Sequence, residues 1–312
     1  MPGAIQSVLI AVLAMGPLSQ PATANECDRE CLRTLTDRYL EALTTRGAEG
    51  LFLAANVRFT ENGQHRQLGE GLWKTSTGVG TFREYFADPS TGNALFIGVV
   101  DENGAPAILA TRLGVDGAGI REIETIVARQ GSHPLFAPER LQDADPLFSA
   151  TEPLASRAPR ERLIEIANAY FDGIERNSSK DIPATADCER FENGVKVTFR
   201  TATSGNCAKS ADHINYIKAV QDRRYFIVDE ATGIVACTVV FDIPGGDPLP
   251  ARPATPVDSG EVQLQTTLRQ PRMLLLTEIF KIQSGQIARI QTVMHNLPHG
   301  SRSGWEQQEA PE

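Results

Sequence analysis

The chain has 312 residues, of which 41% are hydrophobic and 22% charged, and its formal net charge at pH 7 is −9. This length suits two globular domains that are each large enough to bury a core. The acidic balance with scattered basic residues argues against a nucleic-acid-binding surface. No apolar run approaches the roughly 20 residues of a membrane-spanning helix, which argues against membrane insertion.

The first 24 residues predict a signal peptide. Residues 7–18 form a mostly apolar run, and Ala22-Thr23-Ala24 follows as a small-x-small cleavage pattern. The run is too short to span a membrane. We therefore expect a secreted protein, periplasmic or extracellular, whose mature chain starts near Asn25.

The mature chain contains the same pattern twice. Leu35-x3-Tyr39-Leu40-x2-Leu43 recurs as Ile166-x3-Tyr170-Phe171-x2-Ile174, 131 positions later (166 − 35), and Glu61-Asn62-Gly63 recurs as Glu192-Asn193-Gly194 at the same offset. Further on, Ile123-x-Thr125-x-Val127 recurs as Ile290-x-Thr292-x-Met294, 167 positions later (290 − 123). A repeat this long indicates a duplicated domain. The larger second offset places insertions in the second copy.

The first copy, residues 25–133, is predicted to begin with an amphipathic helix, because its apolar residues lie three and four apart. Strands are expected at 94–100 and 107–113, on either side of Asp101-Glu102-Asn103-Gly104, which is a hairpin signal. A third strand follows at 120–128. Residues 134–159, rich in Pro and Ala, are predicted to be a linker.

The second copy, residues 160–305, repeats this plan, with strands predicted at 225–228, 234–241, 272–282 and 286–294. The irregular stretch 244–271 holds six prolines and is predicted to form a lid or a strap. Residues 306–312 are expected to fray. Helices followed by antiparallel strands predict an α+β fold in which the helices cover one face of a curved sheet.

Five cysteines in an exported chain predict disulfides. We expect Cys188 to pair with Cys207 across a short loop of the second copy. Cys27 and Cys31, four positions apart before the first helix, are expected to bridge locally. Cys237 lies in an apolar strand and is predicted to be a buried free thiol. A metal site is the competing interpretation, but the chain has no C-x2-C pair to favour it.

Several of these segments resemble a known superfamily. The first helix, Phe59-Thr60-Glu61-Asn62-Gly63, Gly71-Leu72-Trp73-Lys74 and Ile120-x-Glu122-Ile123-Glu124 are similar to the nuclear transport factor 2-like superfamily, which includes cystatin-like and polyketide-cyclase-like proteins. More narrowly, the chain resembles a group of secreted tandem proteins of bacteria and fungi. The marks of this group are Cys27-Asp28-Arg29-x-Cys31-Leu32, Arg223-Arg224-x3-Val228-Asp229-Glu230 and Ser303-Gly304-Trp305.

The resemblance implies two tandem cone-shaped domains, each a curved antiparallel sheet wrapped on helices. Because single copies of this fold commonly pair through their sheets, it also implies an intramolecular pseudo-dimer. Enzymes of this fold generally carry out acid–base chemistry in an apolar pocket without a cofactor. Some bacterial members of the narrower group resemble secreted β-aryl etherases that act on lignin-derived dimers.

The first candidate site is a stripe of residues in the segment 210–224. His213, Tyr216 and Arg224 share helical spacing with two apolar residues, so a helix would place them on one face. His can shuttle a proton near neutral pH, and Tyr and Arg can stabilise a developing negative charge. The alternative is that Ile214 and Ile217 define the buried face and His213 is solvated at its edge.

A second candidate group contains the acidic residues Asp187 and Glu192, close to Cys188. Burial could raise the pKa of such a carboxylate until it serves as a general base. The alternative is a surface position, since acidic residues before an Asn-Gly turn are usually solvated. The Glu-Asn-Gly motif occurs in both copies, which favours a structural role for it, such as a cap or a fixed turn.

His295 is the third candidate, because it stands where the first copy has Ala128, and a His on a cone strand could reach the cavity. An exposed strand end is the alternative. Glu122 and Glu124 alternate with apolar residues, a pattern typical of a solvated strand face. Trp73 is predicted to serve packing.

Nothing in the sequence indicates a cofactor. It has no Walker loop, no G-x-G-x-x-G before a helix, no G-x-S-x-G and no H-E-x-x-H, so we expect neither a nucleotide cofactor nor a catalytic metal. The hypothesis is a cofactor-independent lyase or hydrolase for a small aromatic compound, with β-aryl ether cleavage as the reaction. Catalytic roles are assigned to His213, Tyr216, Asp187, Glu192, Arg224 and His295.

Two other functions stay open. One is a non-catalytic pocket protein that binds a hydrophobic small molecule, and the other is a purely structural pseudo-dimer. Association into a homo-oligomer is also kept open. The insertions and most candidate residues lie in the second copy, so we expect the working pocket in residues 155–305, covered by residues 244–271.

Overall fold

The computed structural model describes residues 27–117, 119–200, 204–246 and 270–306. The predicted signal peptide and most of the predicted lid lie outside the described residues. No helix in the part of the chain that is described is long and apolar enough to cross a membrane.

The first copy forms one helix, a short second helix and six strands. They are α1 Arg29–Thr45, β1 Leu53–Glu61, β2 Gln64–His65, α2 Leu72–Thr75, β3 Ser76–Asp88, β4 Asn93–Glu102, β5 Ala105–Asp116 and β6 Gly119–Ala128. The helix α1 begins where the Asp28 side chain accepts a hydrogen bond from Cys31 N at 2.9 Å. Its stripe of Leu32, Tyr39, Leu40 and Leu43 is buried, as the spacing predicted.

The linker holds three short helical turns, which are η1 Pro138–Arg140, α3 Pro146–Ser149 and η2 Leu154–Ser156. The elements of the second copy are α4 Arg160–Glu175, β7 Ala184–Glu192, β8 Val195–Lys196, η3 Lys209–His213, β9 Ala219–Asp229, β10 Ile234–Ile243, β11 Arg272–Gln283 and β12 Gln286–Pro298. Every predicted strand lies within one of these strands.

The strand order confirms the duplication. One sheet runs β2-β1-β6-β5-β4-β3 and the other β8-β7-β12-β11-β10-β9, which is the same order in each copy. The chain is therefore an α+β protein of two tandem cones. The sheets differ from the prediction in one respect. The pairs β1–β6 and β7–β12 are parallel, so each sheet is mixed rather than wholly antiparallel. In each copy the last strand, β6 or β12, follows a hairpin and not a helix. That hairpin places the last strand beside β1 or β7.

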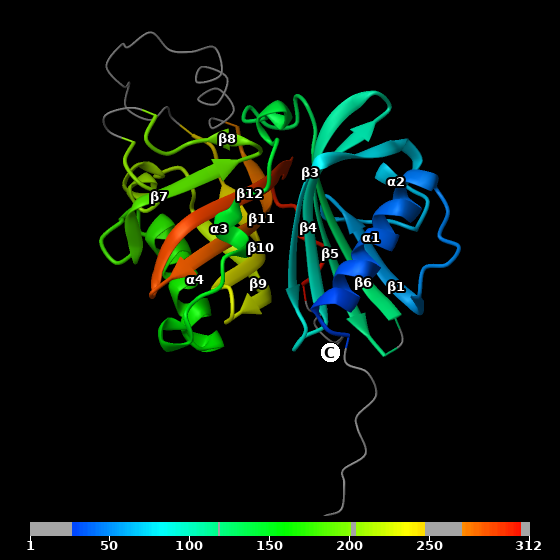
Figure 1. Cartoon of the computed structure of the whole chain (residues 1–312). Coiled ribbons are helices and arrows are strands. Elements are labelled where there is room, and N and C mark those ends of the chain that lie inside the picture. Colours follow the sequence, from blue (N-terminus) through cyan, green and yellow to red (C-terminus); the bar gives the residue numbers. More distant parts are fainter. Residues whose placement is uncertain (1–26, 118, 201–203, 247–269, 307–312) are drawn as a thin grey trace, which may run out of the picture.

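Both faces of each sheet are buried. One face packs on its own helix, α1 or α4, and the other face packs on the opposite sheet (Figure 1). The core between the sheets contains apolar residues of both copies, among them Phe86, Ile97, Ile227 and Ile279. The predicted intramolecular pseudo-dimer is thus confirmed.

Reciprocal ion pairs show that the two copies are related by a pseudo-two-fold axis. Arg29, at the start of α1, binds Asp229 at the end of β9 (Nη2 to Oδ2, 2.9 Å). Arg160, at the start of α4, binds Asp88 at the end of β3 (2.8 Å). Arg160 is the repeat counterpart of Arg29, and Asp229 is that of Asp88. In a two-fold interface the same surface of each partner contacts the other, so every such contact occurs twice.

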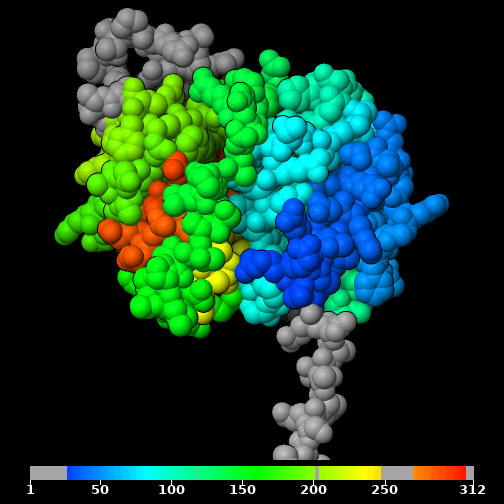
Figure 2. All heavy atoms as spheres, viewed as in Figure 1, coloured from blue at the N-terminus to red at the C-terminus, as the bar shows by residue number. Residues whose placement is uncertain are grey.

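Two segments cross between the copies. After β6, residues 137–145 pass under the second copy's Asn-Gly turn, where Ala137 N donates to Asn193 O at 2.9 Å. After β12, residues 302–306 reach the first copy's turn, and a Cβ on Gly63 would lie 3.0 Å from Arg302 O. We call these segments the linker strap and the tail strap. In Figure 2 the green linker runs along the junction between the blue and cyan half and the half that contains the yellow and red segments.

The shared Asn-Gly turns are structural, as the repeat suggested. Asn62 receives a hydrogen bond from Val127 N (2.8 Å) and donates one to Val127 O (3.2 Å). Asn193 makes the same two bonds with Met294 (2.9 and 3.1 Å). Each Asn therefore fixes its turn to the last strand of its own sheet. Both disulfides, Cys27–Cys31 and Cys188–Cys207, form as predicted, and Cys237 is a buried free cysteine.

Candidate functional site

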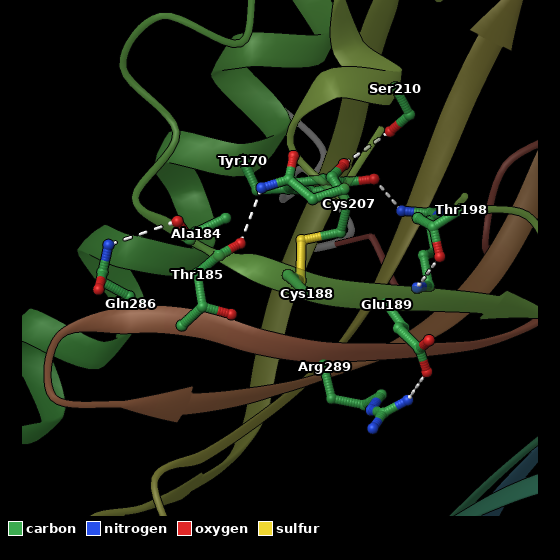
Figure 3. Close-up of a disulfide and its surroundings, with 12 residues drawn as sticks. Tyr170, Ala184, Thr185, Cys188, Glu189, Thr198, Cys207, Ser210, Gln286 and Arg289 are labelled. Atoms are coloured by element: carbon green, nitrogen blue, oxygen red, sulfur yellow. Dashed lines mark hydrogen bonds and ion pairs between the residues drawn. A yellow bond between two sulfur atoms is a disulfide. The ribbon is translucent and has the colours of Figure 1, made fainter. Parts of the chain in front are cut away.

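Strand alternation turns one side of β7 into the second cone. Successive side chains of a strand point to opposite faces, so Cys188, Arg190 and Glu192 share the inner face. The disulfide ties this strand to the segment after β8, and Cys207 N donates to Cys188 O at 3.0 Å. Figure 3 shows Glu189 on the other side of β7, where it pairs with Arg289.

Arg190 is the centre of a buried charged cluster. Its Nε donates to Glu192 Oε1 at 2.7 Å and its Nη1 to Glu278 Oε1 at 2.5 Å. The same Nη1 also contacts the hydroxyl of Tyr170 on α4. Arg190 and Glu278 are almost inaccessible to solvent, whereas 18% of the Glu192 side chain is exposed. A line of charged groups thus leads from a solvent-accessible carboxylate to one at the centre of the cone.

Burial shifts the titration of this cluster. Desolvation raises the pKa of Glu278 above its ordinary value, although the neighbouring Arg190 opposes the shift. Desolvation likewise raises the pKa of Tyr170. The second oxygen of Glu278, Oε2, has no hydrogen-bond partner among the described residues. A buried carboxyl group with one free oxygen and a raised pKa is suited to carry a proton.

The first copy shows that this cluster is not needed for the fold. At the repeat offsets, Arg190 corresponds to Phe59 and Glu278 to Thr111, both of which are buried. Thr111 Oγ1 lies 3.2 Å from Thr125 Oγ1, and this hydroxyl pair replaces the charges. The sequence interpretation missed Arg190 and Glu278. Aligning the copies at the two offsets would have revealed them as an Arg and a Glu in place of a Phe and a Thr.

The two equivalent glutamates also differ. In the first copy, Glu61 Oε2 accepts a hydrogen bond from Leu72 N at 2.7 Å, which caps the short helix α2. Its other oxygen binds Arg129 at 3.1 Å. Among the residues that the structure describes there, the second copy shows no helix corresponding to α2, and Glu192 binds Arg190. The carboxylate that is structural in the first copy is therefore available for chemistry in the second.

Other polar groups surround Glu192. Desolvation raises the pKa of Tyr216 to about 12, and the charges of Glu192, Arg190 and Arg272 also act on it. His133, at the end of the first copy, is buried, which lowers its pKa to about 4, and Glu192 and Arg272 lie close enough to influence it. Arg272 is held by Asn296, whose Oδ1 accepts from Nε at 3.0 Å. Of the predicted site residues, Tyr216 and Glu192 thus lie within electrostatic reach of each other.

The predicted helix over residues 210–224 is wrong. The segment forms the 3-10 helix η3, a turn, and then strand β9, which starts at Ala219. His213 ends η3 and is exposed, so it does not face the cone. Arg224 lies on β9 and binds Glu124 of the first copy (Nη2 to Oε1, 2.6 Å), so it does not pair with Tyr216. The helical spacing was coincidental.

Two other predicted site residues lie outside the cone. Asp187 is exposed on the outer side of β7. His295 sits on the face of β12 that meets the first copy, where burial and the charge of Arg129 lower its pKa. Glu124 was expected on a solvated face but is 4% exposed, bound between Arg112 and Arg224. Trp73 serves packing, as predicted, since it is buried against Tyr39.

Two cavities lie outside the second cone. The larger, of about 920 Å³, is an open cleft between α1, β3 and α3, and its lining includes Arg33, Tyr85, Glu84 and Phe148. The smaller, of about 290 Å³, lies between the two sheets under the linker strap. Glu84 lines both. No group of three His, Cys, Asp or Glu side chains in the described ranges is arranged to hold a metal ion.

Glu84 gives a prediction for stability. Its side chain is 5% exposed, and desolvation raises its pKa from 4.5 to about 7. The folded state therefore binds more protons than the unfolded state between these values, so this group lowers the free energy of unfolding as pH rises from about 4.5 to 7. The difference between these two pKa values sets an upper bound of roughly 3.4 kcal/mol on the loss.

The variant Glu84→Gln should lose this component of the pH dependence. Its unfolding free energy, measured by urea denaturation at pH 5 and pH 7.5, should fall less with rising pH than that of the parent chain. His133 acts in the opposite direction, because its lowered pKa makes stability rise with pH above about 4, but it is present in both proteins. Equal pH profiles for the two proteins would contradict the assignment to Glu84.

In the comparisons with known proteins, one family model matches the second copy. The pattern of a family described as "Domain of unknown function (DUF8021)" matches residues 156–294, which is less than half of the chain. No curated protein matches the chain.

Solved structures match over about the length of one copy. A candidate polyketide cyclase of Xanthomonas campestris pv. campestris is 17% identical, and the match covers 43% of this chain and 90% of that chain with a TM-score of 0.29. AclR, a candidate hydroxylase of Streptomyces galilaeus, is 11% identical, with 49% and 91% covered and a TM-score of 0.32. A de novo designed protein with a curved β-sheet is 10% identical, with 44% and 87% covered and a TM-score of 0.29.

Proposed function

We propose that the second cone is the active site of a cofactor-independent acid–base enzyme that acts on a small aromatic compound. The observation that carries this proposal is the buried Arg190–Glu278 pair, with Glu192 at its accessible end, where the first copy has Phe59 and Thr111. Buried charges cost free energy, and replacing a buried pair by apolar residues is often neutral or stabilising. A charged cluster that the fold can do without is therefore a candidate for chemistry.

The reaction that we propose is hydrolytic cleavage of a β-aryl ether bond in a lignin-derived dimer. Glu192, which solvent reaches, removes a proton from water. Burial raises the pKa of Glu278 to about 7, so near neutral pH part of it is protonated and returns a proton to the departing phenolic oxygen. Arg190 between them stabilises the negative charge that develops on that oxygen. Water adds across the bond, and the products are an alcohol and a phenol.

The two disulfides support a further part of the proposal, which is export. Disulfides persist in oxidising compartments and are rare in the cytosol, and this chain forms two. Together with the cleavage pattern at Ala22-Thr23-Ala24 they fit a secreted enzyme.

The test is turnover of a panel of phenolic β-O-4 dimers by the mature protein. We expect Glu192→Gln and Glu278→Gln to lower kcat by roughly 10² to 10⁴, the range for loss of an acid–base group. Asp187→Asn lies on the same strand but on its outer side, and His213→Ala lies on an exposed turn, so both should retain the parent rate.

Each contrary result is informative. A parent protein that turns over no member of the panel would refute ether cleavage, and saturable binding without turnover would identify a pocket protein instead. Loss of activity in Asp187→Asn or His213→Ala, with full activity in the two Gln variants, would place the active site elsewhere.

A further inference from the structure

The pseudo-two-fold axis creates two equivalent places between the sheets, one beneath each strap. Beneath the tail strap the place is filled by Trp305, which is 8% exposed. Beneath the linker strap the equivalent place is the cavity of about 290 Å³. We call it the interdomain cavity. The filled place shows what kind of molecule such a place accommodates.

The indole of Trp305 is held by one hydrogen bond and by cations over its ring. Its Nε1 donates to Thr60 Oγ1 at 2.7 Å. The guanidinium carbons of Arg58 and Arg112 lie 4.2 and 4.8 Å from the ring centre, and that of Arg224 lies 5.8 Å away. A planar aromatic ring with one N–H donor thus fits between the two sheets.

Three residues of the interdomain cavity are the repeat counterparts of residues at or beside the Trp305 site. Phe191 and Gln291 line the cavity, and they correspond to Thr60 and Glu124 by the repeat offsets. Glu84 corresponds to Arg224, because each pairs with the same position of its neighbouring strand, Ile97 in one sheet and Thr238 in the other. The linker strap, residues 137–145, carries no aromatic side chain to fill the space.

The polar end of the interdomain cavity has a free acceptor. Only 5% of the surface of Glu84 is exposed, and its Oε1 accepts a hydrogen bond from Asp145 N at 2.9 Å. Its Oε2 has no hydrogen-bond partner among the described residues. The amide of Gln291 lies close enough to lower the pKa of Glu84, but it makes no hydrogen bond of ordinary geometry to Oε2. A buried acceptor without a donor costs free energy, and a ligand that supplies the donor removes that cost.

Size and lining narrow the ligand further. An apolar cavity of about 150 Å³ holds a benzene molecule, so about 290 Å³ has room for one single or fused ring system. The apolar part of the wall is formed by Phe82, Ile108, Leu141, Phe191 and Val293. The charged residues Arg140, Asp143, Asp145 and Lys196 also line the cavity. The apolar part suits an aromatic ring, and the polar end suits one donor.

We propose that the interdomain cavity binds a planar aromatic molecule with one O–H or N–H donor, such as a phenol or an indole. The ring lies between Phe191 and Val293, and the donor bonds to Glu84 Oε2. This site is separate from the second cone and does not rest on the proposed enzymatic function. It is a binding site, and no bond forms or breaks in it.

The experiment is isothermal titration of the mature protein with phenol and indole, with toluene as a probe of the same shape without a donor. We expect one saturable site for phenol and for indole. Glu84→Leu should weaken the binding of phenol by at least about tenfold, equivalent to roughly 1.4 kcal/mol. The affinity for toluene should stay nearly unchanged in this variant. Val293→Phe should abolish binding of all three, because the added ring fills the cavity.

A second variant tests the symmetry argument. Trp305→Ala vacates the equivalent place, so this variant should bind a second equivalent of indole, while Val293→Phe in that background should return the stoichiometry to one. If Trp305→Ala does not fold, the comparison of phenol with toluene in Glu84→Leu still decides. Absence of saturable binding at millimolar probe, or binding that survives both Glu84→Leu and Val293→Phe unchanged, would overturn the proposal.

Discussion

Arg190→Phe should destabilise the protein by about 3–5 kcal/mol, the cost of breaking a buried ion pair from one side. The substitution leaves Glu278 without its cation in a place where solvent does not reach. The carboxyl group then folds only in its protonated form. The loss should therefore be larger at pH 8 than at pH 5, because holding a raised pKa costs more stability as the pH rises. Urea denaturation at the two pH values measures both effects.

The double variant Arg190→Phe with Glu278→Thr should recover most of this loss. It installs the pair that the first copy already buries, Phe59 and Thr111. Thr is smaller than Glu, so a remaining cost of about 1 kcal/mol is expected for the space it leaves. If the proposed function is correct, the double variant is folded and has no turnover. A folded double variant with the parent's turnover would show that the pair is dispensable, and the active site would have to be sought elsewhere.

The duplication explains why so much of the fold was predictable. Local patterns identified the helices α1 and α4 and the strands β4 to β6 and β9 to β12, but not β1 to β3, β7 and β8. Asn103-Gly104 marked a hairpin that the structure forms. Comparing the two copies then indicated a structural role for the Glu-Asn-Gly motif, which the Asn62 and Asn193 bonds bear out for its Asn-Gly turn. The glutamates of the motif differ, since Glu61 caps α2 and Glu192 binds Arg190. Cysteine spacing gave both disulfides because each pair is close in sequence.

The site was less predictable because its contacts are distant in sequence. Arg190 and Glu278 are 88 positions apart, and they meet only because β7 and β11 both flank β12 in the sheet order. A charged residue in an apolar strand carries no local sign of its partner. Only the comparison with Phe59 and Thr111 would have indicated that the two residues changed together.

Glu124 and Arg224 were misread for a related reason. On a strand, alternation of polar and apolar residues distinguishes two faces but does not say what covers each. Here the polar face of β6 packs on the second copy, so Glu124 binds Arg112 and Arg224 and is not solvated. In the segment 210–224, helical spacing coincided with a turn followed by a strand, and tertiary pairing with β10 decided the outcome.

Trp305 should be the other position of large effect, although it lies near the C-terminus. Its side chain is buried, bonds to Thr60 and lies under Arg58 and Arg112. The neighbouring Ser303 hydroxyl contacts Asp222 of β9. The tail strap thus attaches the edge of the first sheet to the second copy, so a change here acts on the interface as a whole.

Trp305→Ala should lower the free energy of unfolding by about 3–5 kcal/mol, the usual range for a buried Trp. Trp305→Phe keeps the ring but loses the N–H donor to Thr60, so its cost should be nearer 1–2 kcal/mol. Phe52→Ala, at a side chain that is 58% exposed, is the matched control and should change stability by less than about 0.5 kcal/mol. Urea denaturation followed by far-UV circular dichroism measures all three. A Trp305→Ala variant within 1 kcal/mol of the parent would mean that the tail strap rests on the surface without holding the copies together, because the indole would then exchange its contacts for water at almost no cost.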